Sequence, residues 1–339
     1  MHPETLPDAA RPKPLVSIVV PCYNEANTIG FLLNALYSQS YPREGMEVVI
    51  ADGMSTDRSQ EQVSVFQQTH PELPIRVVQN QKRIIPAGLN QAIRAAQGEV
   101  IVRLDGHAMP APDYVLRCVA ALEQGRGENV GGVWQIEPAR PGWVAQSIAA
   151  AAAHPLGVGD ALYRYADRAQ AVDTVPFGAF YRSLVERIGP FDETLLTNED
   201  YEFNTRVRLS GGRVWLDPAI RSKYLARASL AALARQYARY GYWKMRMLRR
   251  YPSTIRWRQA LPPAFVFSLV ILALLAILVP LARWLLTAEI VLYALALLAA
   301  GVQVAVKKRK GALAIGVPLA IATMHLAWGG AFLWSLIRK

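Results

Sequence analysis

The stretch NQKRIIPAGLNQAIRAAQGEVIVRLDGHA, residues 80–108, decides the fold. Residues 87–97 place apolar side chains at helical spacing, and Gly98 is predicted to close this helix as a C′ glycine. The segment EVIVRL (99–104) follows at once and predicts a strand that ends at Asp105. A helix that leads directly into such a strand is typical of an α/β sheet whose strands run mainly parallel.

Upstream, the same alternation of strands and helices continues. Strands are predicted at 15–20, 46–51 and 75–79, and helices at 27–40 and 57–69. Asn27 is the predicted N-cap of the first helix. Ligands of parallel α/β sheets bind beyond the carboxyl ends of the strands. Asn24-Glu25, Asp52 and Asp105 each follow a strand, so we expect all of them to face one crevice.

Downstream of residue 110 the pattern is less regular and then becomes strongly apolar. Helices are predicted near 143–153 and 183–188 and over 229–250, and a strand at 213–217. Three apolar stretches follow, at 264–282, 284–306 and 312–337. Each is long enough to cross about 30 Å of hydrocarbon as a helix. Burial in a soluble core is the weaker interpretation, because three such runs in succession exceed what a core needs.

Charge is concentrated just before these stretches. The 339-residue chain is 52% hydrophobic and has a net charge of +11. Residues 221–258, here called the basic belt, hold 11 Lys and Arg and no acid, whereas residues 1–220 are net acidic. An acidic front half argues against nucleic-acid binding, and the basic belt favours contact with anionic lipid. The two cysteines, Cys22 and Cys118, have no metal-ligand spacing and indicate free thiols in a reduced compartment.

The same residues predict an orientation in a membrane. The tail 1–14 lacks an apolar signal sequence, so we expect the front half to stay in the cytosol, attached to the inner membrane. Residues 307–310 (KKRK) lie between the second and third apolar stretches, and the positive-inside rule places them in the cytosol with the basic belt. Three alternating spans then leave Arg338 and Lys339 outside, which conflicts with that rule.

Five polar motifs have both a chemical and an ordinary structural interpretation. Asp52 can accept hydrogen bonds from a nucleoside, or it can simply favour a turn with Gly53. Asp105-Gly106-His107 can hold a divalent cation or form a loop. Lys82 and Arg83 can neutralise a phosphate or lie in solvent.

Glu199-Asp200 supplies a possible general base, or it complements the dipole at a helix N-terminus. In the fifth motif, Gln236–Tyr240, the basic and aromatic side chains can cover a diphosphate or anchor a helix at a membrane surface.

As an ordered set, these motifs resemble those of the inverting, GT-A-fold glycosyltransferases of family two. The resemblance is carried by PCYNEANTI (21–29), ADGMSTDRS (51–59), residues 80–108, FGAFYRSLVERIGPFDETLLTNEDYEFNTRV (177–207) and QYARY (236–240). Within the family, IVRLDGHA and the apolar C-terminal region are similar to those of bacterial exopolysaccharide (succinoglycan) biosynthesis glucosyltransferases.

The resemblance implies an α/β fold with a Rossmann-like mixed sheet and flanking helices. The catalytic domain is expected over residues 15–225. Basic amphipathic interfacial helices are expected over 226–262, and a transmembrane helical region over 263–339.

The resemblance also implies roles for individual residues at the strand ends. Pro21, Tyr23, Glu25 and Asp52 would hold the nucleotide of a sugar donor, most simply a UDP-sugar. Arg83 is the best match to the basic residue that contacts the nucleotide, with Lys82 as the second choice.

The family's metal motif is Asp-x-Asp, and here its second carboxylate is replaced by a histidine. Asp105, which also contributes to the donor site, is therefore expected to bind Mg²⁺ or Mn²⁺. His107 either acts as a further ligand, which would favour Mn²⁺, or takes no part.

The resemblance makes Asp200 the catalytic base and Glu199 its supporting residue. Gln236 and Arg239 match the motif Gln-x-x-Arg-Trp of processive members, with Tyr240 in place of Trp, and would close over the acceptor and the diphosphate. That replacement argues against processive synthesis.

The expected function is transfer of a sugar to a hydroxyl of a polyprenyl-diphosphate-linked saccharide at a membrane, in exopolysaccharide or cell-envelope glycan synthesis. One alternative is a polyprenyl-phosphate glycosyltransferase, whose phosphate acceptor needs no general base. The other is a catalytically silent membrane scaffold. The residues leave the identity of the sugar open.

Overall fold

The computed structural model describes residues 14–338, so most of the predicted N-terminal tail lies outside the described residues. Within that range one nine-stranded sheet has the order β3-β2-β1-β4-β8-β6-β9-β5, with β7 paired to β9. The strands are β1 Val16–Cys22, β2 Met46–Asp52, β3 Ile75–Gln79, β4 Val100–Arg103, β5 Met109–Pro110, β6 Asn129–Pro138, β7 Gln170–Ala171, β8 Ala179–Tyr181 and β9 Val214–Ala226.

The first half of the sheet is parallel, as the sequence predicts. Strand β1 pairs in parallel with both β2 and β4, so that Val16 stands opposite Met46 and Val100. Strand β3 extends this half, also in parallel. Strands β1, β2 and β4 are mostly apolar and almost fully buried because helices cover both faces of this part of the sheet, whereas the edge strand β3 is more exposed. Alternate residues of β1 therefore enter two different cores, Ile18 on one face and Val19 on the other.

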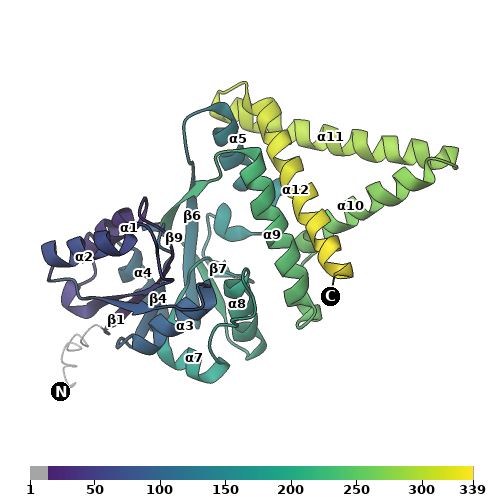
Figure 1. Ribbon diagram of the computed structural model, residues 1–339. Helices are drawn as coiled ribbons and strands as arrows, with labels where there is room; N and C mark the ends of the chain where they lie inside the picture. Colours follow the sequence, from purple (N-terminus) through teal and green to yellow (C-terminus); the bar gives the residue numbers. More distant parts are fainter. Residues whose placement is uncertain (1–13, 339) are drawn as a thin grey trace, which may run out of the picture.

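The second half of the sheet is mixed. Strand β8 pairs antiparallel with β4 and with β6, while β6 and β9 run parallel. Strand β9 is 13 residues long, far longer than the predicted strand at 213–217, because the alternating segment after Asp217 continues along β6. These two long strands reach from the centre of the sheet toward the C-terminal helices (Figure 1).

Eight helices flank the sheet in the described part of the chain before residue 210. They are α1 Ile29–Tyr37, α2 Ser59–Thr69, α3 Ile85–Ala95, α4 Tyr114–Glu123, α5 Trp143–Ala152, α6 Pro155–Val158, α7 Arg182–Ile188 and α8 Glu199–Leu209. The predicted fold class is thus confirmed: a mixed α/β sheet with flanking helices, of the GT-A type.

Two local predictions are wrong. Thr28, not Asn27, precedes the first residue of α1, and the chain turns there through the backbone carbonyl of Glu25. Helix α3 ends with Ala96 as its cap, and Gly98 does not have a positive φ. Gly98 is required for space instead, because a Cβ atom there would lie 2.6 Å from the backbone nitrogen of Ser17.

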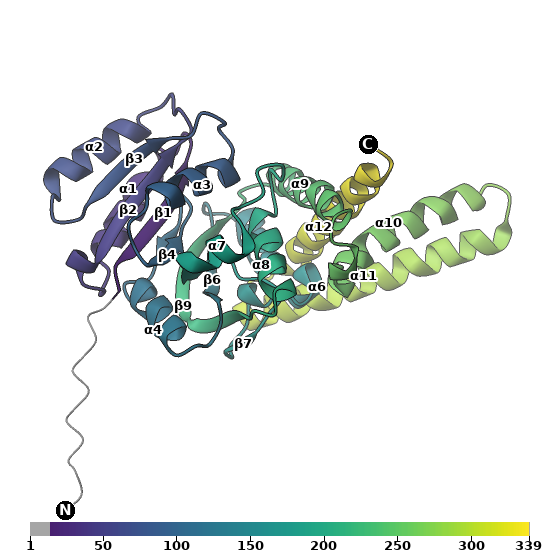
Figure 2. The same ribbon diagram turned by 90° about the horizontal axis from the view of Figure 1, so that it is seen from below.

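The last third of the chain forms four long helices, α9 Leu230–Leu248, α10 Trp257–Leu275, α11 Pro280–Lys308 and α12 Leu313–Ile337. The last three are long and apolar enough to cross a membrane. The predicted stretches 284–306 and 312–337 match α11 and α12, whereas 264–282 runs past the end of α10 into the start of α11. Helices α10 and α11 project together away from the sheet (Figures 1 and 2). Helix α12 instead packs along α9 and against α5.

The start of α12 contacts α5, which flanks the sheet, and its end contacts the residue that follows α9. At its start, Lys310 donates a hydrogen bond to Gln146 of α5 at 2.9 Å. At its end, Arg249, directly after α9, donates to the carbonyl oxygens of Leu336 and Arg338 at 3.2 and 3.3 Å. Helix α12 therefore differs in its surroundings from the projecting pair.

Candidate active site

The loops that follow β1 and β2 are joined by backbone and side-chain hydrogen bonds. Cys22 and Asp52 are partners in the strand register, and the amide of Gly53 donates to the carbonyl of Cys22 at 2.7 Å. The amide of Asn24 donates to Ser55, and Asn24 accepts from the amide of Thr56. These contacts fix the two strand-end loops relative to each other.

Asp52 is buried at the junction of these loops. Its Oδ2 accepts hydrogen bonds from the amide of Ser55 at 3.0 Å and from Gln60. Its Oδ1 is buried and has no partner among the residues that the structure describes. An unpaired buried carboxylate oxygen is costly, and it is available to a ligand donor. Tyr23 lies close to this loop, against Gly53, and its side chain is nearly half exposed.

The two candidate phosphate-binding residues differ in their surroundings. Lys82 forms an ion pair with Glu193 at 2.6 Å. Arg83 adopts a left-handed backbone with φ of 56°, and its amide donates to the carbonyl of Asn80 at 3.1 Å. Its exposed guanidinium has no hydrogen bond or ion pair with any described residue, so of the two cations only that of Arg83 is unpaired.

Glu25 turns away from the nucleoside side and contacts His107. Its Oε1 lies 2.9 Å from His107 Nδ1, and its Oε2 accepts from Thr28 at 2.5 Å. The hydrogen bond that His107 donates to the Glu25 carboxylate raises the pKa of His107, and the nearby Asp105 adds to that effect. The structure therefore brings Glu25 to the Asp105 motif rather than to Asp52.

Arg103, which the sequence analysis did not single out, links the two acidic motifs. Its Nη2 donates to Glu199 at 2.8 Å and to Asp105 at 3.2 Å, although the two acids lie 94 positions apart. Burial disfavours the arginine's charge, but the carboxylates of Asp105, Glu199 and Asp200 outweigh it and raise the pKa of Arg103. Burial also raises the pKa of Glu199, and Arg103 opposes this. A charge inside an otherwise apolar strand was the signal that could have identified Arg103.

Asp200 is placed by the first turn of α8. The preceding Asn198 has a left-handed backbone with φ of 68° and donates to the carbonyl of Tyr240 at 3.3 Å. Asp200 accepts from the amide of Tyr201 and remains partly exposed. Glu199 is buried against Arg103, whereas Asp200 is partly exposed and lines the cavity described below.

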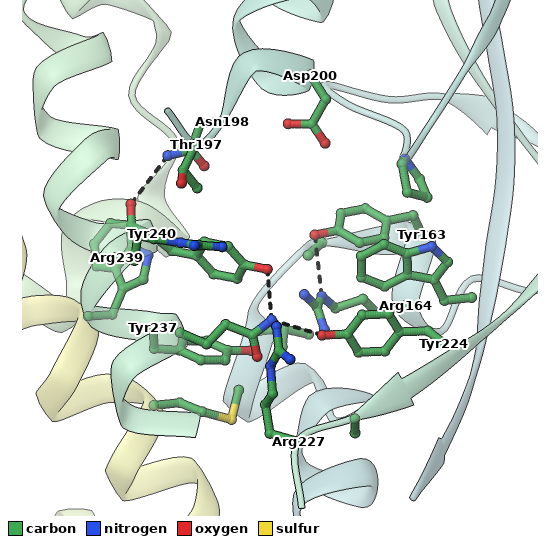
Figure 3. Close-up of a pocket in the computed structure, with 18 of the residues that line it drawn as sticks. Tyr163, Arg164, Thr197, Asn198, Asp200, Tyr224, Arg227, Tyr237, Arg239 and Tyr240 are labelled. Carbon is green, nitrogen blue, oxygen red and sulfur yellow. Dashed lines mark hydrogen bonds between the residues drawn. The ribbon is translucent and has the colours of Figure 1, made fainter. Parts of the chain in front are cut away.

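Helix α9 lies across from Asp200 (Figure 3). Gln236 donates to the hydroxyls of Tyr224 and Tyr240, each at 2.9 Å. Burial raises the pKa of Tyr240, so its hydroxyl stays protonated. Arg239 is exposed, and its guanidinium has no hydrogen bond or ion pair with any described residue. Of the predicted covering residues, Gln236 and Tyr240 are thus held in a network and Arg239 is free.

A single cavity of about 1460 Å³ connects most of these groups. Predicted site residues that line it are Glu25, Asp105, His107, Glu199, Asp200, Gln236, Arg239 and Tyr240. Pro21, Tyr23, Asp52 and Arg83 do not line it. The cavity continues past α9 to the apolar residues Leu261 and Phe265 of α10 and Trp328 of α12. The structure thus separates a strand-end group from a larger chamber that reaches the C-terminal helices.

The residues present fit a divalent cation that takes most of its ligands from a substrate. No cluster of three acidic, histidine or cysteine side chains suited to a metal ion occurs among residues 14–338. Asp105 nevertheless lines the cavity with a partly exposed carboxylate. Mg²⁺ is commonly held by one or two carboxylates together with substrate phosphates. Glu25 accepts the hydrogen bond of His107 Nδ1, which leaves Nε2 as the ring nitrogen that a cation could reach.

The sequence profile described as glycosyl transferase family 2 matches residues 17–189. The chain belongs to this family. Its members are inverting hexosyltransferases, so the predicted family and enzyme class are confirmed. The matched range contains every predicted strand-end residue and stops before Glu199.

Relatives of the same length support the assignment. The succinoglycan biosynthesis protein ExoA of Rhizobium meliloti is 30% identical over 94% of this chain and 94% of its own. A dolichyl N-acetyl-alpha-D-glucosaminyl phosphate 3-beta-D-2,3-diacetamido-2,3-dideoxy-beta-D-glucuronosyltransferase of Methanococcus voltae is 26% identical over 95% and 97%.

Among solved structures, the Pyrobaculum calidifontis mannosyltransferase PcManGT, in complex with GDP-Man and Mn²⁺, superposes with a TM-score of 0.58. The superposition covers 93% of this chain and 88% of the mannosyltransferase, with 23% of the residues identical. It shows that the two proteins share a fold.

Proposed function

We propose that this chain transfers a sugar from a UDP-linked donor to a hydroxyl of a polyprenyl-diphosphate-linked saccharide, in exopolysaccharide or cell-envelope glycan synthesis. The observation that carries the proposal is the cavity that joins Asp105 and Asp200 to the apolar helices α10 and α12. An acceptor with a sugar end and a prenyl end needs such a connection, whereas a fully water-soluble acceptor does not. The catalytic part then faces the cytosol at the inner membrane.

The donor nucleotide is assigned to the strand-end group. The unpaired Oδ1 of Asp52 accepts a hydrogen bond from the base or the ribose. The exposed ring of Tyr23 stacks on the base, with Pro21 beside it. Arg83 supplies a free guanidinium to the phosphates. These residues lie outside the main chamber, whereas Asp105 lines it. The diphosphate of the bound donor therefore extends from the strand-end residues to Asp105.

The chemical step is assigned to Asp200. Its carboxylate takes the proton of the acceptor hydroxyl while that oxygen attacks C1 of the donor sugar. The bond from C1 to the diphosphate breaks on the opposite face, so the anomeric configuration inverts. Glu199, held by Arg103, keeps the first turn of α8 in position. A Mg²⁺ or Mn²⁺ ion held by Asp105, with His107 as the further candidate ligand, would supply positive charge to the departing diphosphate.

Helix α9 completes the site from the opposite side. The free guanidinium of Arg239 neutralises charge that develops on the diphosphate. Gln236 and Tyr240 hold each other and Tyr224 in place, so the wall facing the acceptor is preorganised. The basic belt that contains this helix attracts an anionic lipid carrier to the same surface.

The substitution Asp200→Asn tests the proposal. Loss of the base should lower kcat by about 10²–10⁴ while leaving the affinity for donor nucleotide unchanged. Asp167→Asn, an exposed aspartate outside the cavity, is the matched control and should keep full activity. Transfer that survives Asp200→Asn would favour the polyprenyl-phosphate glycosyltransferase, because a phosphate acceptor needs no base.

A donor screen of the purified full-length enzyme tests the nucleotide and the metal. UDP-, GDP- and dTDP-sugars are compared with and without EDTA. We expect transfer from a UDP-sugar that EDTA abolishes and Mn²⁺ restores. Failure to hydrolyse or transfer any of these sugars would support the catalytically silent scaffold.

A further inference from the structure

Arg164 is a buried cation that has no counter-ion in the protein. It lies between β6 and α9, is only 7% exposed, and lines the main cavity. No carboxylate among residues 14–338 forms an ion pair with it, unlike Arg103 and Arg258, which each bind two acids. Removing a charge from water without a partner is strongly unfavourable. A group with this environment is therefore prepared for an anion that the protein does not itself provide.

The surroundings of Arg164 fix its direction but satisfy little of its hydrogen-bonding capacity. Its Nε donates to the hydroxyl of Tyr163 at 3.3 Å, and its Nη1 donates to the carbonyl of Ala152 at a long 3.4 Å. Its Nη2 has no partner in the described chain. The guanidinium thus keeps donors free for a ligand.

Aromatic rings hold the guanidinium on several sides. Its central carbon lies 5.0 Å from the ring of Trp134, 5.2 Å from Tyr163 and 6.0 Å from Tyr224. Trp134 and Tyr224 stack on each other at 4.2 Å. Figure 3 shows the guanidinium between Tyr163 and Tyr224 and directed into the chamber. Cation–π contacts orient an arginine without neutralising its charge. The N–H donors of the guanidinium therefore remain available to the oxygens of an anion.

The position of Arg164 identifies the kind of anion. Ala152, which accepts its hydrogen bond, is the last residue of α5, the helix that packs against α12. The same cavity is lined by Tyr237 on α9 and by Met324 and Trp328 on α12. The strand-end residues Asp52 and Arg83 do not line it. Arg164 therefore shares its chamber with the apolar helices and not with Asp52 and Arg83.

We propose that Arg164, within its cage of Trp134, Tyr163 and Tyr224, binds the phosphate of a polyprenyl carrier whose chain leaves the cavity between α10 and α12. The inference rests on the proposed function, since it names the end of the acceptor that the chamber holds. The charged phosphate satisfies the unpaired guanidinium, and the first isoprene units contact Leu261, Phe265 and Trp328. The sugar end is then directed toward Asp200.

Binding of geranylgeranyl phosphate to the detergent-solubilised full-length protein tests the assignment. Arg164→Gln should weaken this binding by about tenfold or more, the loss expected for charge-assisted hydrogen bonds. Binding of UDP with Mn²⁺ should stay unchanged. Arg168→Gln, which removes an exposed arginine four residues away, is the matched control and should bind both ligands normally.

Three results would overturn the assignment. Unchanged binding of geranylgeranyl phosphate by Arg164→Gln is the first. An equal loss of UDP binding is the second, because it would place the donor diphosphate on Arg164. Equal competition by inorganic phosphate is the third, because it would remove the role of the prenyl chain.

Stability and turnover separate this assignment from a structural role and from the proposed function. An uncompensated buried charge does not stabilise the fold, so the thermal midpoint of Arg164→Gln should not fall. If it falls, Arg164→Lys decides: unchanged binding of geranylgeranyl phosphate by this variant contradicts recognition of the phosphate by the paired N–H donors of the guanidinium.

A protein that binds the lipid through Arg164 but transfers no sugar would contradict the proposed function alone. Transfer with an unchanged KM for the lipid acceptor in Arg164→Gln would contradict this inference alone.

Discussion

Arg103 holds the two acidic motifs of the site together, and its removal should destabilise the folded protein. It is buried and pairs with the buried Glu199 as well as with the more exposed Asp105. Arg103→Met leaves Glu199 charged and unpaired, which should lower the free energy of unfolding by about 3–5 kcal/mol. Denaturant unfolding of the detergent-solubilised enzyme measures this loss.

The double variant Arg103→Met/Glu199→Met provides the control. It buries no unpaired charge, so most of the lost stability should return. A double variant as unstable as Arg103→Met alone would mean that packing of the arginine stem, rather than the ion pair, is what the fold requires.

Lys244 presents the opposite case, a buried amine beside the reacting residues. It is 2% exposed, and its Nζ lies 2.9 Å from the ring centroid of Tyr201. Burial lowers the pKa of Lys244 well below its usual range, and Asp173 only partly opposes this. The unfolded chain therefore binds a proton that the folded chain releases, so stability should rise with pH up to the unfolded pKa, by at most about 1.4 kcal/mol per pH unit.

Lys244→Met removes this dependence. Its free energy of unfolding should exceed that of the parent at pH 7, and the difference should shrink as the pH approaches 10. Urea unfolding at several pH values measures the slope, with Lys223→Met, an exposed lysine, as the control. A variant that is less stable than the parent at pH 7 would show that the contact with Tyr201 outweighs the cost of burial.

At the scale of elements, the contact between α9 and α12 depends on one glycine. A Cβ atom at Gly241 would lie 2.1 Å from the carbonyl oxygen of Trp328. Gly241→Ala must therefore move the two helices apart, at a cost of about 1–3 kcal/mol. Because α9 carries Gln236 and Tyr240, we also expect a lower transfer rate, measured with the thermal midpoint.

Gly330 on α12 is the matched control for this prediction. A Cβ atom there would meet no heavy atom within 4 Å. Gly330→Ala should leave activity intact and can add up to about 1 kcal/mol through helix propensity. Equal effects of the two substitutions would contradict a specific role for the close approach at Gly241.

The elements that the sequence predicts well are those whose pattern is local. Strands β1, β2 and β4 are buried on both faces, so their β-branched runs are unmistakable. Only the first part of strand β9 was predicted. Its second half alternates polar and apolar residues and is a strand because it pairs with β6, a contact that is distant along the chain. Boundaries and caps depend on contacts such as that of Gly98 with Ser17, which lie 81 positions apart.

The same limit applies to the candidate site. The family resemblance implied that Asp105, Asp200 and Gln236 belong to one site, and all three line one cavity in the structure. The sequence did not reveal that Glu25 contacts His107 or that Arg103 contacts Glu199. Nor did it reveal the isolation of Arg164, since a missing counter-ion is a property of the folded surroundings. Partners can be read from sequence only where they are close along the chain.

At the scale of the whole molecule, the arrangement of the C-terminal helices predicts how the protein lies in a membrane. The most apolar windows of α10 and α11 are only 11% and 17% buried, whereas that of α12 is 44% buried. Helix α12 lies along α9, with its start joined to Gln146 of α5 and its end joined to Arg249 after α9. We therefore expect α10 and α11 to cross the bilayer as a hairpin and α12 to remain with α9 on the cytosolic side. Arg338 then stays in the cytosol, which removes the conflict with the positive-inside rule.

Cysteine labelling with a membrane-impermeant maleimide tests this topology. The native Cys22 and Cys118 are buried, so the unmodified chain serves as the unlabelled background. Leu278→Cys, between α10 and α11, should react only from the outer face, and Gly311→Cys, between α11 and α12, only in inverted vesicles. Ile337→Cys, at the end of α12, discriminates between the two topologies. Labelling of this position from the cytosolic face is expected, because Arg249 binds the neighbouring carbonyls there. Labelling from the outer face would mean that α12 crosses as well, and that its contact with α9 is lost in the membrane.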